Sequence, residues 1–339
     1  MAYPAGHRVG SEWGRGGVDK GARIYVAGHR GLVGSALVRY LRAAGHTNLI
    51  LRSRQELDLL DLPAVRRFYE AEKPEYVFVA AARVGGIAAN STYPAEFIHE
   101  NTLIAAHTMD EAYRNGVKRL LYLGSSCIYP RDCPQPIRED YMLTGPLEET
   151  NRAYAVAKIA GVEMCWSYNR EHGTQFLAAM PTNIYGPGDR YDLQGSHVIP
   201  ALIQKCHRAK VAGEREVVIW GTGAPLREFL YSEDLAEGLT HLMCLPDADF
   251  KRACGDAKLA PVVNVGSGIE LTIRDLANKA RQAVGFNGEL VFDATKPDGT
   301  PRKLLDVSRM ASFGWRAHTP LETGLKHAYA DFLSRYPGG

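Results

Sequence analysis

A phenol and an ammonium group lie four residues apart at Tyr154 and Lys158. In a helix, residues with this spacing lie on one face, so both side chains can act on the same ligand. A free tyrosine titrates near ~10, and a neighbouring cation favours its phenolate. Such a phenol can donate or accept a proton nearer neutral pH. The pair predicts a site of proton transfer, provided that the fold places its helix beside a substrate.

A glycine-rich loop near the start of the chain has the form GxxGxxG. It joins the apolar run 24–27 to an amphipathic stretch over 32–44, and it reads Gly28-His29-Arg30-Gly31-Leu32-Val33-Gly34. The first glycine permits a tight turn, the second lets backbone approach a pyrophosphate, and the third lets the helix pack against the strand. The helix N-terminus attracts the anion. The seven residues predict a dinucleotide-binding loop.

The residues after the next apolar run indicate which dinucleotide is bound. Sites that select NAD usually carry Asp or Glu about 20 residues downstream, on the ribose 2′-hydroxyl. Here the chain reads Arg52-Ser53-Arg54, with no acidic residue before Glu56. Together with Arg30, these guanidinium groups can grip a 2′-phosphate in forked geometry. We predict NADP(H); the alternative is that these arginines are solvated surface residues.

The elements that must position these groups follow from the apolar pattern. Short apolar runs, in which polar and apolar residues do not alternate, are separated by helical stretches. They lie at 24–27, 49–51, 76–80, 119–123 and 176–180. Such runs are typical of a parallel sheet covered on both faces. We predict a Rossmann-like, doubly wound α/β domain over 23–181 and a smaller C-terminal α/β substrate-binding lobe, mainly 182–339, with part of 217–270 returning to the sheet. Residues 1–22, polar and Gly/Arg-rich, predict a disordered extension.

Small polar residues follow the fourth apolar run, in the order Gly124-Ser125-Ser126-Cys127. In open α/β sheets, ligands bind at the carboxyl ends of the strands. These side chains are therefore expected to face the cofactor crevice, where the helix of Tyr154 and Lys158 also lies if it follows this strand.

Composition excludes several classes of function. The 339 residues are 45% hydrophobic and 23% charged, with a net charge of +2. This balance argues against a nucleic-acid or membrane-surface binder, which would show a basic excess. No segment has the ~18 consecutive apolar residues of a membrane span. The six cysteines form no CxxC pair, so neither a disulfide framework nor a metal is expected, and a reducing, cytoplasmic location is predicted.

The glycine loop, the strand-end serine and the Tyr-x-x-x-Lys pair together resemble the extended short-chain dehydrogenase/reductase superfamily, whose members act on nucleotide sugars. Longer strings resemble one family within it, the GDP-L-fucose synthases. The likeness covers about residues 23–335. Its most specific parts are Cys127 after the serine pair and His197 within Ser196-His197-Val198-Ile199-Pro200. Further strings are Pro181–Pro187, Arg227-Glu228-Phe229 and Lys296–Lys303.

The resemblance implies a reaction and roles for the residues that match. The substrate would be GDP-4-keto-6-deoxy-D-mannose, epimerised at C3 and C5 and then reduced at C4 with NADPH. Cys127 would be the base and His197 the acid of epimerisation. Tyr154 would donate the proton in the reduction, assisted by Lys158, while Ser125 binds the carbonyl oxygen. Either residue of the Cys127–His197 pair alone is more often a packing residue, and His197 could instead be a hydrogen-bond partner of the nicotinamide.

The same resemblance implies binding residues beyond the loop. For the cofactor these are Arg54, Leu123, Gly124, Ser125, Ser126, Lys158, Pro181, Asn183, Ile184 and His197. For the GDP moiety they are Lys205, Trp220, Arg227 and Asp298. Trp220 follows three apolar residues and could be a core residue, while Lys205 could be solvated. The basic stretch 296–303 reads as an exposed loop that could close over the substrate.

Two helices with apolar stripes predict a homodimer, because relatives of the resembled family pair through a helix seam. The alternative is packing within one chain. The stripes are Phe97, Ile98, Leu103, Ile104 and Met109 in one helix and Val156, Ile159, Val162 and Trp166 in the other.

Two other functions remain as alternatives. One is another nucleotide-sugar epimerase or a 4,6-dehydratase of the same superfamily. These enzymes hold NAD tightly, and the dehydratases need an acid beside the strand-end serine; Arg52, Arg54 and Ser126-Cys127 argue against them. The other is a non-catalytic NADPH-binding protein, which would have gaps in the catalytic set.

Overall fold

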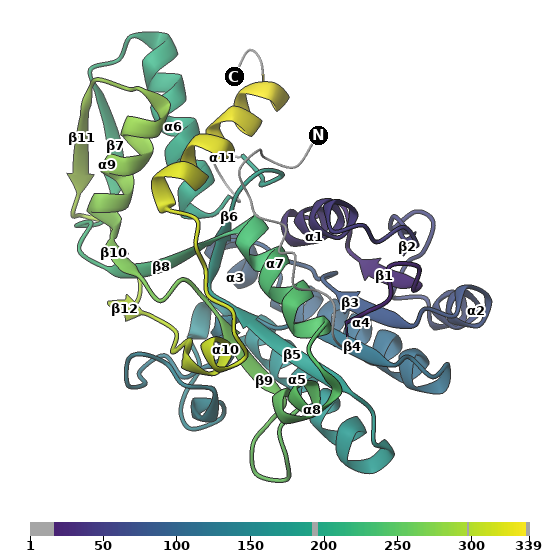
Figure 1. The fold of residues 1–339 in the computed structure, drawn as a ribbon. Coiled ribbons are helices and arrows are strands. Elements are labelled where there is room, and N and C mark those ends of the chain that lie inside the picture. Colours follow the sequence, from purple (N-terminus) through teal and green to yellow (C-terminus); the bar gives the residue numbers. More distant parts are fainter. Residues whose placement is uncertain (1–16, 192–195, 297, 337–339) are drawn as a thin grey trace.

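The larger part of the molecule is built on a six-stranded parallel sheet (Figure 1). The structure is a computed structural model that describes residues 17–191, 196–296 and 298–336. The strand order is β2-β1-β3-β4-β5-β9. The bounds are β1 Ile24–Ala27, β2 Leu49–Ile50, β3 Tyr76–Val79, β4 Arg119–Leu123, β5 Phe176–Pro181 and β9 Val262–Val265. The predicted Rossmann-like parallel sheet is confirmed.

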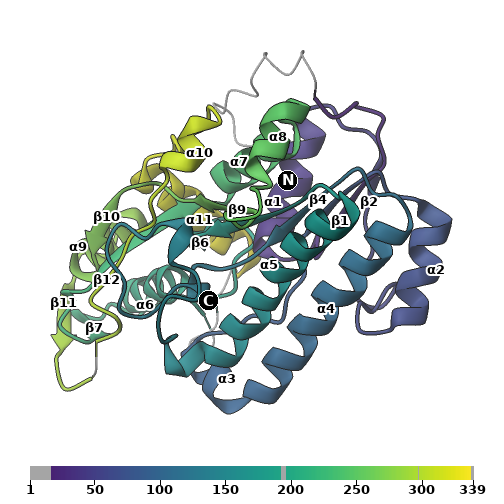
Figure 2. The same ribbon diagram turned by 90° about the horizontal axis from the view of Figure 1, so that it is seen from below.

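Helices cover both faces of this sheet, as Figure 2 shows from below. Side chains alternate between the faces along each strand. Ile24 and Val26 of β1 join one core with α1 and α7, while Tyr25 and Ala27 join the other with α2, α4 and α5. The helices are α1 Leu32–Ala43, α2 Leu62–Glu72, α3 Ile87–Thr92, α4 Pro94–Arg114, α5 Arg152–His172, α7 Ser232–Met243, α8 Asp247–Ala253 and α10 Ser308–Ser312.

Part of the predicted N-terminal extension is packed into the fold. Residues 1–16, on which the rest of that prediction falls, lie outside the described part of the chain. Val18 and Ala22, however, are buried in the core beside α1 and α7. The backbone carbonyl of Lys20 accepts a hydrogen bond from the Thr47 amide at 3.0 Å. Two well-spaced apolar residues were too weak a signal for this packed segment, so the boundary at residue 22 is wrong.

The smaller lobe is built from two further sheets and three helices. Its strands are β6 Asn183–Tyr185, β8 Leu226–Tyr231, β10 Glu270–Thr272 and β12 Arg302–Lys303 in one sheet, and β7 Glu216–Trp220 and β11 Glu289–Asp293 in the other. Its helices are α6 Val198–Ala212, α9 Ile273–Val284 and α11 Leu321–Arg335. The Thr272 hydroxyl caps α9 by accepting from the Asp275 amide at 3.0 Å. Within the stretch 217–270, part of which was predicted to return to the main sheet, β9 does join that sheet, whereas β7 pairs with β11.

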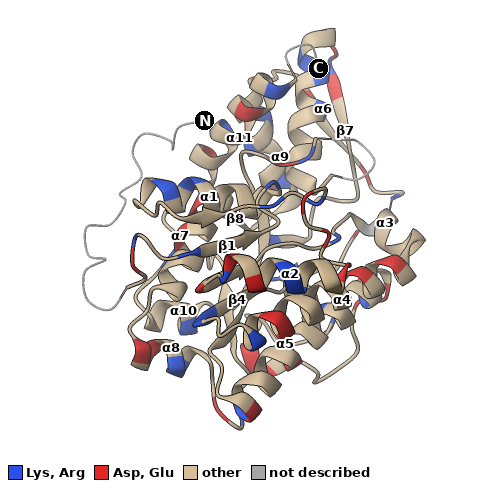
Figure 3. Ribbon diagram, turned by 90° about the vertical axis from the view of Figure 1, so that its right-hand side faces the viewer, with Lys and Arg blue, Asp and Glu red and all other residues tan. Residues whose placement is uncertain are grey.

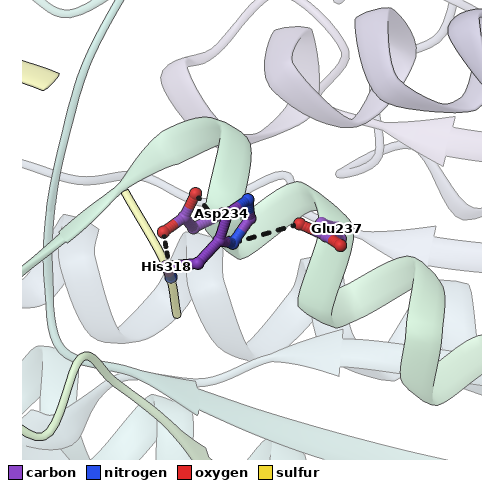
Figure 4. A group of neighbouring side chains, drawn as sticks. All are labelled: Asp234, Glu237 and His318. Carbon is purple, nitrogen blue, oxygen red and sulfur yellow. Dashed lines mark hydrogen bonds and ion pairs between the residues drawn. The ribbon is translucent and has the colours of Figure 1, made fainter. Parts of the chain in front are cut away.

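A polar cluster fastens the segment before α11 onto α7 (Figure 4). The Asp234 carboxylate accepts hydrogen bonds from the backbone amide of His318 at 3.0 Å and from that of Thr319 at 2.8 Å. It also accepts one from the Thr319 hydroxyl. His318 Nδ1 lies 3.6 Å from the Glu237 carboxylate. Because the buried Asp234 already accepts three hydrogen bonds from the chain itself, the cluster is explained as a structural tie between the two parts.

Charged residues of both signs are interspersed along the ribbon in Figure 3. Several pair across neighbouring helices, as Arg66 of α2 does with Glu111 of α4 at 2.8 Å. Within the described residues, no helix combines the length and apolar character that a membrane span requires.

Candidate active site

The first half of α5 lies against the carboxyl end of β4 and contacts it at successive points. Lys158 Nζ donates a hydrogen bond to the Leu123 carbonyl at 2.7 Å. One turn earlier, the Tyr154 phenol is hydrogen-bonded to the Ser125 side chain. The predicted pair thus lies beside the predicted strand end, because residues four apart share one face of the helix.

Burial governs the protonation of this pair. Lys158 is only 2% exposed, and loss of hydration lowers its pKa to about 7. Burial also raises the pKa of Tyr154 well above its ordinary value, while the hydrogen bond to Ser125 acts in the opposite direction. Burial thus outweighs any lowering of the pKa by the lysine, and the expectation of a phenol that titrates nearer neutral pH is wrong for this structure. A phenol that keeps its proton at neutral pH is suited to donate it.

Cys127 continues the same row of contacts. Asn151, at the start of α5, donates from Nδ2 to the Cys127 Sγ at 3.2 Å. Lys303 of β12 places Nζ 4.0 Å from the same sulfur. The thiol is half-buried, and all six cysteines of the chain are free. The site therefore holds a thiol, a phenol and a hydroxyl within one short stretch of β4 and α5.

His197 reaches the site from the other part of the molecule. It precedes the first residue of α6 and is separated by Ser196 from residues 192–195, which lie outside the described part. The residue is exposed, yet the protein around it still lowers its pKa by desolvation. No hydrogen bond joins His197 to Cys127 or Tyr154 within the described residues, so the predicted acid is not placed against the predicted base.

The glycine loop has the shape that a pyrophosphate requires. Gly28 has a φ of +80°, and a Cβ there would lie 2.7 Å from Ala81 Cα. A Cβ on Gly34 would collide with the Gly28 carbonyl. Gly31 leaves the N-terminus of α1 without a side-chain cap, and the first turn of α1 has no acidic residue. The backbone N–H groups of this first turn can therefore donate hydrogen bonds to an anion. The loop thus fits the pyrophosphate of a dinucleotide.

The three arginines near the loop differ in their surroundings. Arg30 is exposed and forms no ion pair with any described residue. Arg54 lies 3.7 Å from Asp58 and 3.8 Å from Glu100, with its side chain 65% exposed. Arg52 is paired with Glu72. Arg30 is thus the guanidinium that a 2′-phosphate could engage without breaking an existing pair.

The other predicted cofactor residues lie at two strand ends. Gly124 packs closely on Met180, where a Cβ would collide with the thioether, and Ser126 is buried. Pro181 ends β5 opposite Val265. Asn183 and Ile184 belong to β6, and Asn183 lines a pocket of the smaller lobe.

That pocket has a volume of about 250 Å³ and gathers three of the four predicted GDP residues: Trp220, Arg227 and Asp298. Burial lowers the pKa of Arg227, and the Asp298 charge opposes the shift. Asp298 accepts a hydrogen bond from the Thr222 amide at 3.0 Å. Trp220 is 69% exposed, so the alternative of a core tryptophan is wrong.

Lys205, the fourth predicted residue, lies beside the pocket on α6. Its Nζ donates to the Val218 carbonyl at 3.1 Å and lies 5.7 Å from the centre of the Trp220 ring. Burial lowers its pKa. The lysine is therefore packed against the tryptophan, and the alternative of a fully solvated side chain is wrong.

A comparison with family models assigns the chain. Residues 24–266 match the family described as "NAD dependent epimerase/dehydratase family". This range includes the glycine loop, both strand ends and the Tyr154–Lys158 pair. The chain belongs to this family.

Within the epimerase/dehydratase family, similarity to individual proteins extends over almost the whole chain. It is 52% identical to GDP-L-fucose synthase 1 of Arabidopsis thaliana, covering 93% of this chain and 94% of that protein. It is 48% identical to the GDP-L-fucose synthase of Escherichia coli strain K12, covering 92% and 96%. A crystal structure of a GDP-L-fucose synthetase from Naegleria fowleri bound to NADP superposes with a TM-score of 0.84 at 27% identity, covering 95% and 97%.

Two residues of this epimerase/dehydratase site escaped the sequence reasoning. Asn151 lies three residues before Tyr154 and so shares its helix face, a signal that could have been found. Lys303 belongs to the basic stretch 296–303, which was interpreted as a loop. The structure instead forms β12 at Arg302–Lys303, in parallel register with β8. Nothing in the sequence relates residue 303 to residue 127.

The apolar stripes of α4 and α5 are mainly internal. Phe97 and Met109 of α4 and Val162 of α5 are buried within the chain. Ile98 remains 37% exposed and Val156 38% exposed. The prediction that the stripes face a partner is therefore wrong for the buried residues Phe97, Met109, Ile159 and Val162, and it stays untested for the other stripe residues.

Proposed function

We propose that this chain converts GDP-4-keto-6-deoxy-D-mannose to GDP-L-fucose, by epimerisation at C3 and C5 followed by NADPH-dependent reduction at C4. The observation that carries the proposal is the row of contacts between β4 and α5. It holds a free thiol at Cys127 and a protonated phenol at Tyr154 beside one strand end. Epimerisation and ketone reduction need these two kinds of group at one sugar ring.

The 4-keto group makes the epimerisation accessible to ordinary side chains, because it acidifies the hydrogens on C3 and C5. Inversion of each centre requires a base to remove a proton and an acid on the opposite face to return one. Cys127 is the base in this proposal and His197 is the acid. Desolvation lowers the pKa of His197, so its ring is mostly neutral at pH 7. The negative charge of a bound diphosphate substrate opposes that shift and favours the protonated ring.

The reduction needs a proton at the forming C4 alkoxide. Bound NADPH supplies the hydride. Tyr154 donates the proton from its phenol, and Ser125 donates a hydrogen bond to the carbonyl oxygen. Lys158 lies 5.7 Å from the centre of the Tyr154 ring, where its ammonium form, present at and below its pKa of about 7, can stabilise the phenolate that remains. The loop Gly28–Gly34 would hold the cofactor's pyrophosphate.

The GDP moiety is assigned to the pocket of the smaller lobe. Arg227 and Lys205 can offset the diphosphate charge, and the exposed ring of Trp220 offers a stacking face. Asp298 is held by Thr222 at the rim. The relatives named GDP-L-fucose synthase support a GDP-sugar as the ligand.

The decisive assay mixes the pure protein with NADPH and GDP-4-keto-6-deoxy-D-mannose. NADPH absorbance is followed and the sugar product is identified. The expected result is NADPH loss with GDP-L-fucose as product. Absence of NADPH consumption would favour the alternative of a non-catalytic NADPH-binding protein. A separate incubation with GDP-D-mannose and no added NADPH tests the related enzymes, which would give a 4-keto-6-deoxy product or a 4-epimerised product.

Replacing the proposed base tests the epimerisation separately. Cys127→Ser is expected to abolish epimerisation and to leave NADPH binding intact, because the thiol is half-buried at the sugar end and lies outside the glycine loop. NADPH affinity is measured by fluorescence titration and epimerisation by product analysis. Cys133→Ser, a second half-buried cysteine, is the matched control. Normal turnover of Cys127→Ser would end the assignment.

We also propose a homodimer that pairs through α4 and α5. It is supported by the exposed apolar side chains of Ile98 and Val156 on these adjacent helices. Light scattering at micromolar concentration is expected to give twice the 37.3 kDa chain mass. A monomer mass would contradict it.

A further inference from the structure

The Cys127 sulfur is contacted by two hydrogen-bond donors that come from distant parts of the chain. Asn151 Nδ2 lies 3.2 Å from it and Lys303 Nζ lies 4.0 Å from it. A cation and an amide donor both interact more favourably with a thiolate than with a thiol. The role proposed for Cys127 requires the thiolate, since only that form removes a proton.

Asn151 can support both protonation states of the sulfur. Its Oδ1 is buried and has no hydrogen-bond partner among the described residues. The amide carries a donor and an acceptor on opposite sides, and a turn of its plane exchanges them. With Nδ2 toward the sulfur it donates to the thiolate; with Oδ1 toward the sulfur it accepts the S–H. A base that gains and loses a proton in each cycle needs such a partner.

The position of the Lys303 backbone is set by the pairing of its strand, β12. β12 pairs with β8, and in this register Lys303 lies opposite Arg227, which lines the nucleotide pocket. Lys303 forms no ion pair with any described carboxylate, so its charge is not offset there. Two ionisable groups interact with these residues: the Tyr154 phenol with the sulfur and the Cys133 thiol with the lysine. Both are neutral while protonated, which leaves Lys303 as the positive charge beside Cys127.

We propose that Lys303 and Asn151 are positioning residues that orient the Cys127 sulfur toward the sugar and favour its thiolate over its thiol. The inference rests on the proposed function only in taking Cys127 as the base. It concerns two residues outside the motif shared with the wider superfamily. It also links the thiol to the smaller lobe, because Lys303 and Arg227 occupy adjacent strands.

The test measures the fraction of Cys127 that is thiolate, and it needs no substrate. Alkylation of Cys127 by iodoacetamide is followed by mass spectrometry between pH 5 and pH 10, since only the thiolate reacts. Lys303→Met is expected to displace the pH profile upward by about one unit and to slow alkylation at pH 7 by about tenfold. Asn151→Asp is expected to displace it in the same direction, because a carboxylate repels the thiolate. Lys303→Arg keeps the charge and should restore the profile.

Two controls separate this effect from misfolding and from the enzymatic proposal. Thermal unfolding and NADPH binding of each variant show whether the fold is intact, and alkylation at Cys244, another half-buried cysteine, measures general exposure in the same sample. A displaced Cys127 profile without any turnover would retain this inference and reject the proposed function. Unchanged profiles in Lys303→Met and Asn151→Asp, with the fold intact, would overturn the inference.

Discussion

The strand end of β4 and the pocket of the smaller lobe offer opposite environments to a ligand. Lys158 is 2% exposed and already bonded to a backbone carbonyl, whereas Trp220 is 69% exposed. Tyr154 and Lys158, which are proposed for the reduction, are preorganised by α5, so little rearrangement is needed there when a substrate binds. The groups proposed for GDP recognition line a pocket of the smaller lobe, where the ligand would add to the few polar contacts that they already make. The reduction and the recognition of GDP thus depend on different parts of the fold.

Removing the phenol from the buried region should have the largest effect. Tyr154→Phe keeps the ring but loses the proton donor, and we expect the rate of ketone reduction to fall about 10²- to 10⁴-fold. Single-turnover oxidation of NADPH measures the rate. Tyr113→Phe, at an exposed tyrosine of α4, is the control. A loss below threefold in Tyr154→Phe would show that another group donates the proton.

The buried lysine should make stability depend on pH. The Lys158 pKa is lowered from 10.5 to about 7 in the folded chain. Between these values the unfolded chain binds the extra proton, so this residue adds stability as the pH rises, by up to about 1.4 kcal/mol per pH unit. Urea unfolding at pH 7 to 10 should show the slope, and Lys158→Met should remove it.

Lys251→Met is the matched control for that slope, because Lys251 is exposed on α8. Equal slopes in the Lys158→Met variant and the unmodified chain would mean that Lys158 stays charged in the folded protein, and the contrast between the two regions would be weaker than described.

A substitution in the open pocket should affect binding more than catalysis. Arg227→Met removes a charge that is proposed to meet the diphosphate, and we expect KM for the GDP-sugar to rise about 10- to 100-fold with kcat nearly unchanged. Steady-state kinetics measure both constants. Arg208→Met, at an exposed position of α6, should change neither. A fall in kcat alone would place Arg227 in the chemical step.

The smallest change is expected at the cofactor loop. Arg30→Gln removes one guanidinium group from an exposed position, and the KM for NADPH should rise about tenfold while that for NADH stays constant. Arg67→Gln, on the exposed side of α2, serves as the control. An equal change for both cofactors would show that Arg30 does not contact the 2′-phosphate.

The sheet could be predicted because each of its strands is a short apolar run, and burial on both faces imposes that pattern. The smaller lobe could be predicted only in part. Its strands β6, β10 and β12 contain two or three residues each, too few for any periodicity. Val18 and Ala22 were missed for the same reason, since two isolated apolar residues do not indicate a packed segment.

The site divides in the same way. Tyr154, Lys158 and the glycine loop lie within single elements, where spacing alone brings side chains together. The contact between Lys303 and Cys127 depends on how β12 pairs with β8, and no local pattern encodes it. The protonation of Tyr154 was predicted wrongly, because spacing specifies its neighbour but not the depth of burial that determines its pKa.

The central claim, that one site both epimerises and reduces a 4-keto sugar, is tested most directly by turnover in heavy water. GDP-4-keto-6-deoxy-D-mannose and NADPH are incubated with the protein in D₂O, and the product is analysed by NMR. The account predicts GDP-L-fucose that carries deuterium at both C3 and C5, with one NADPH consumed per product. A reduced sugar without deuterium at these two carbons would contradict it.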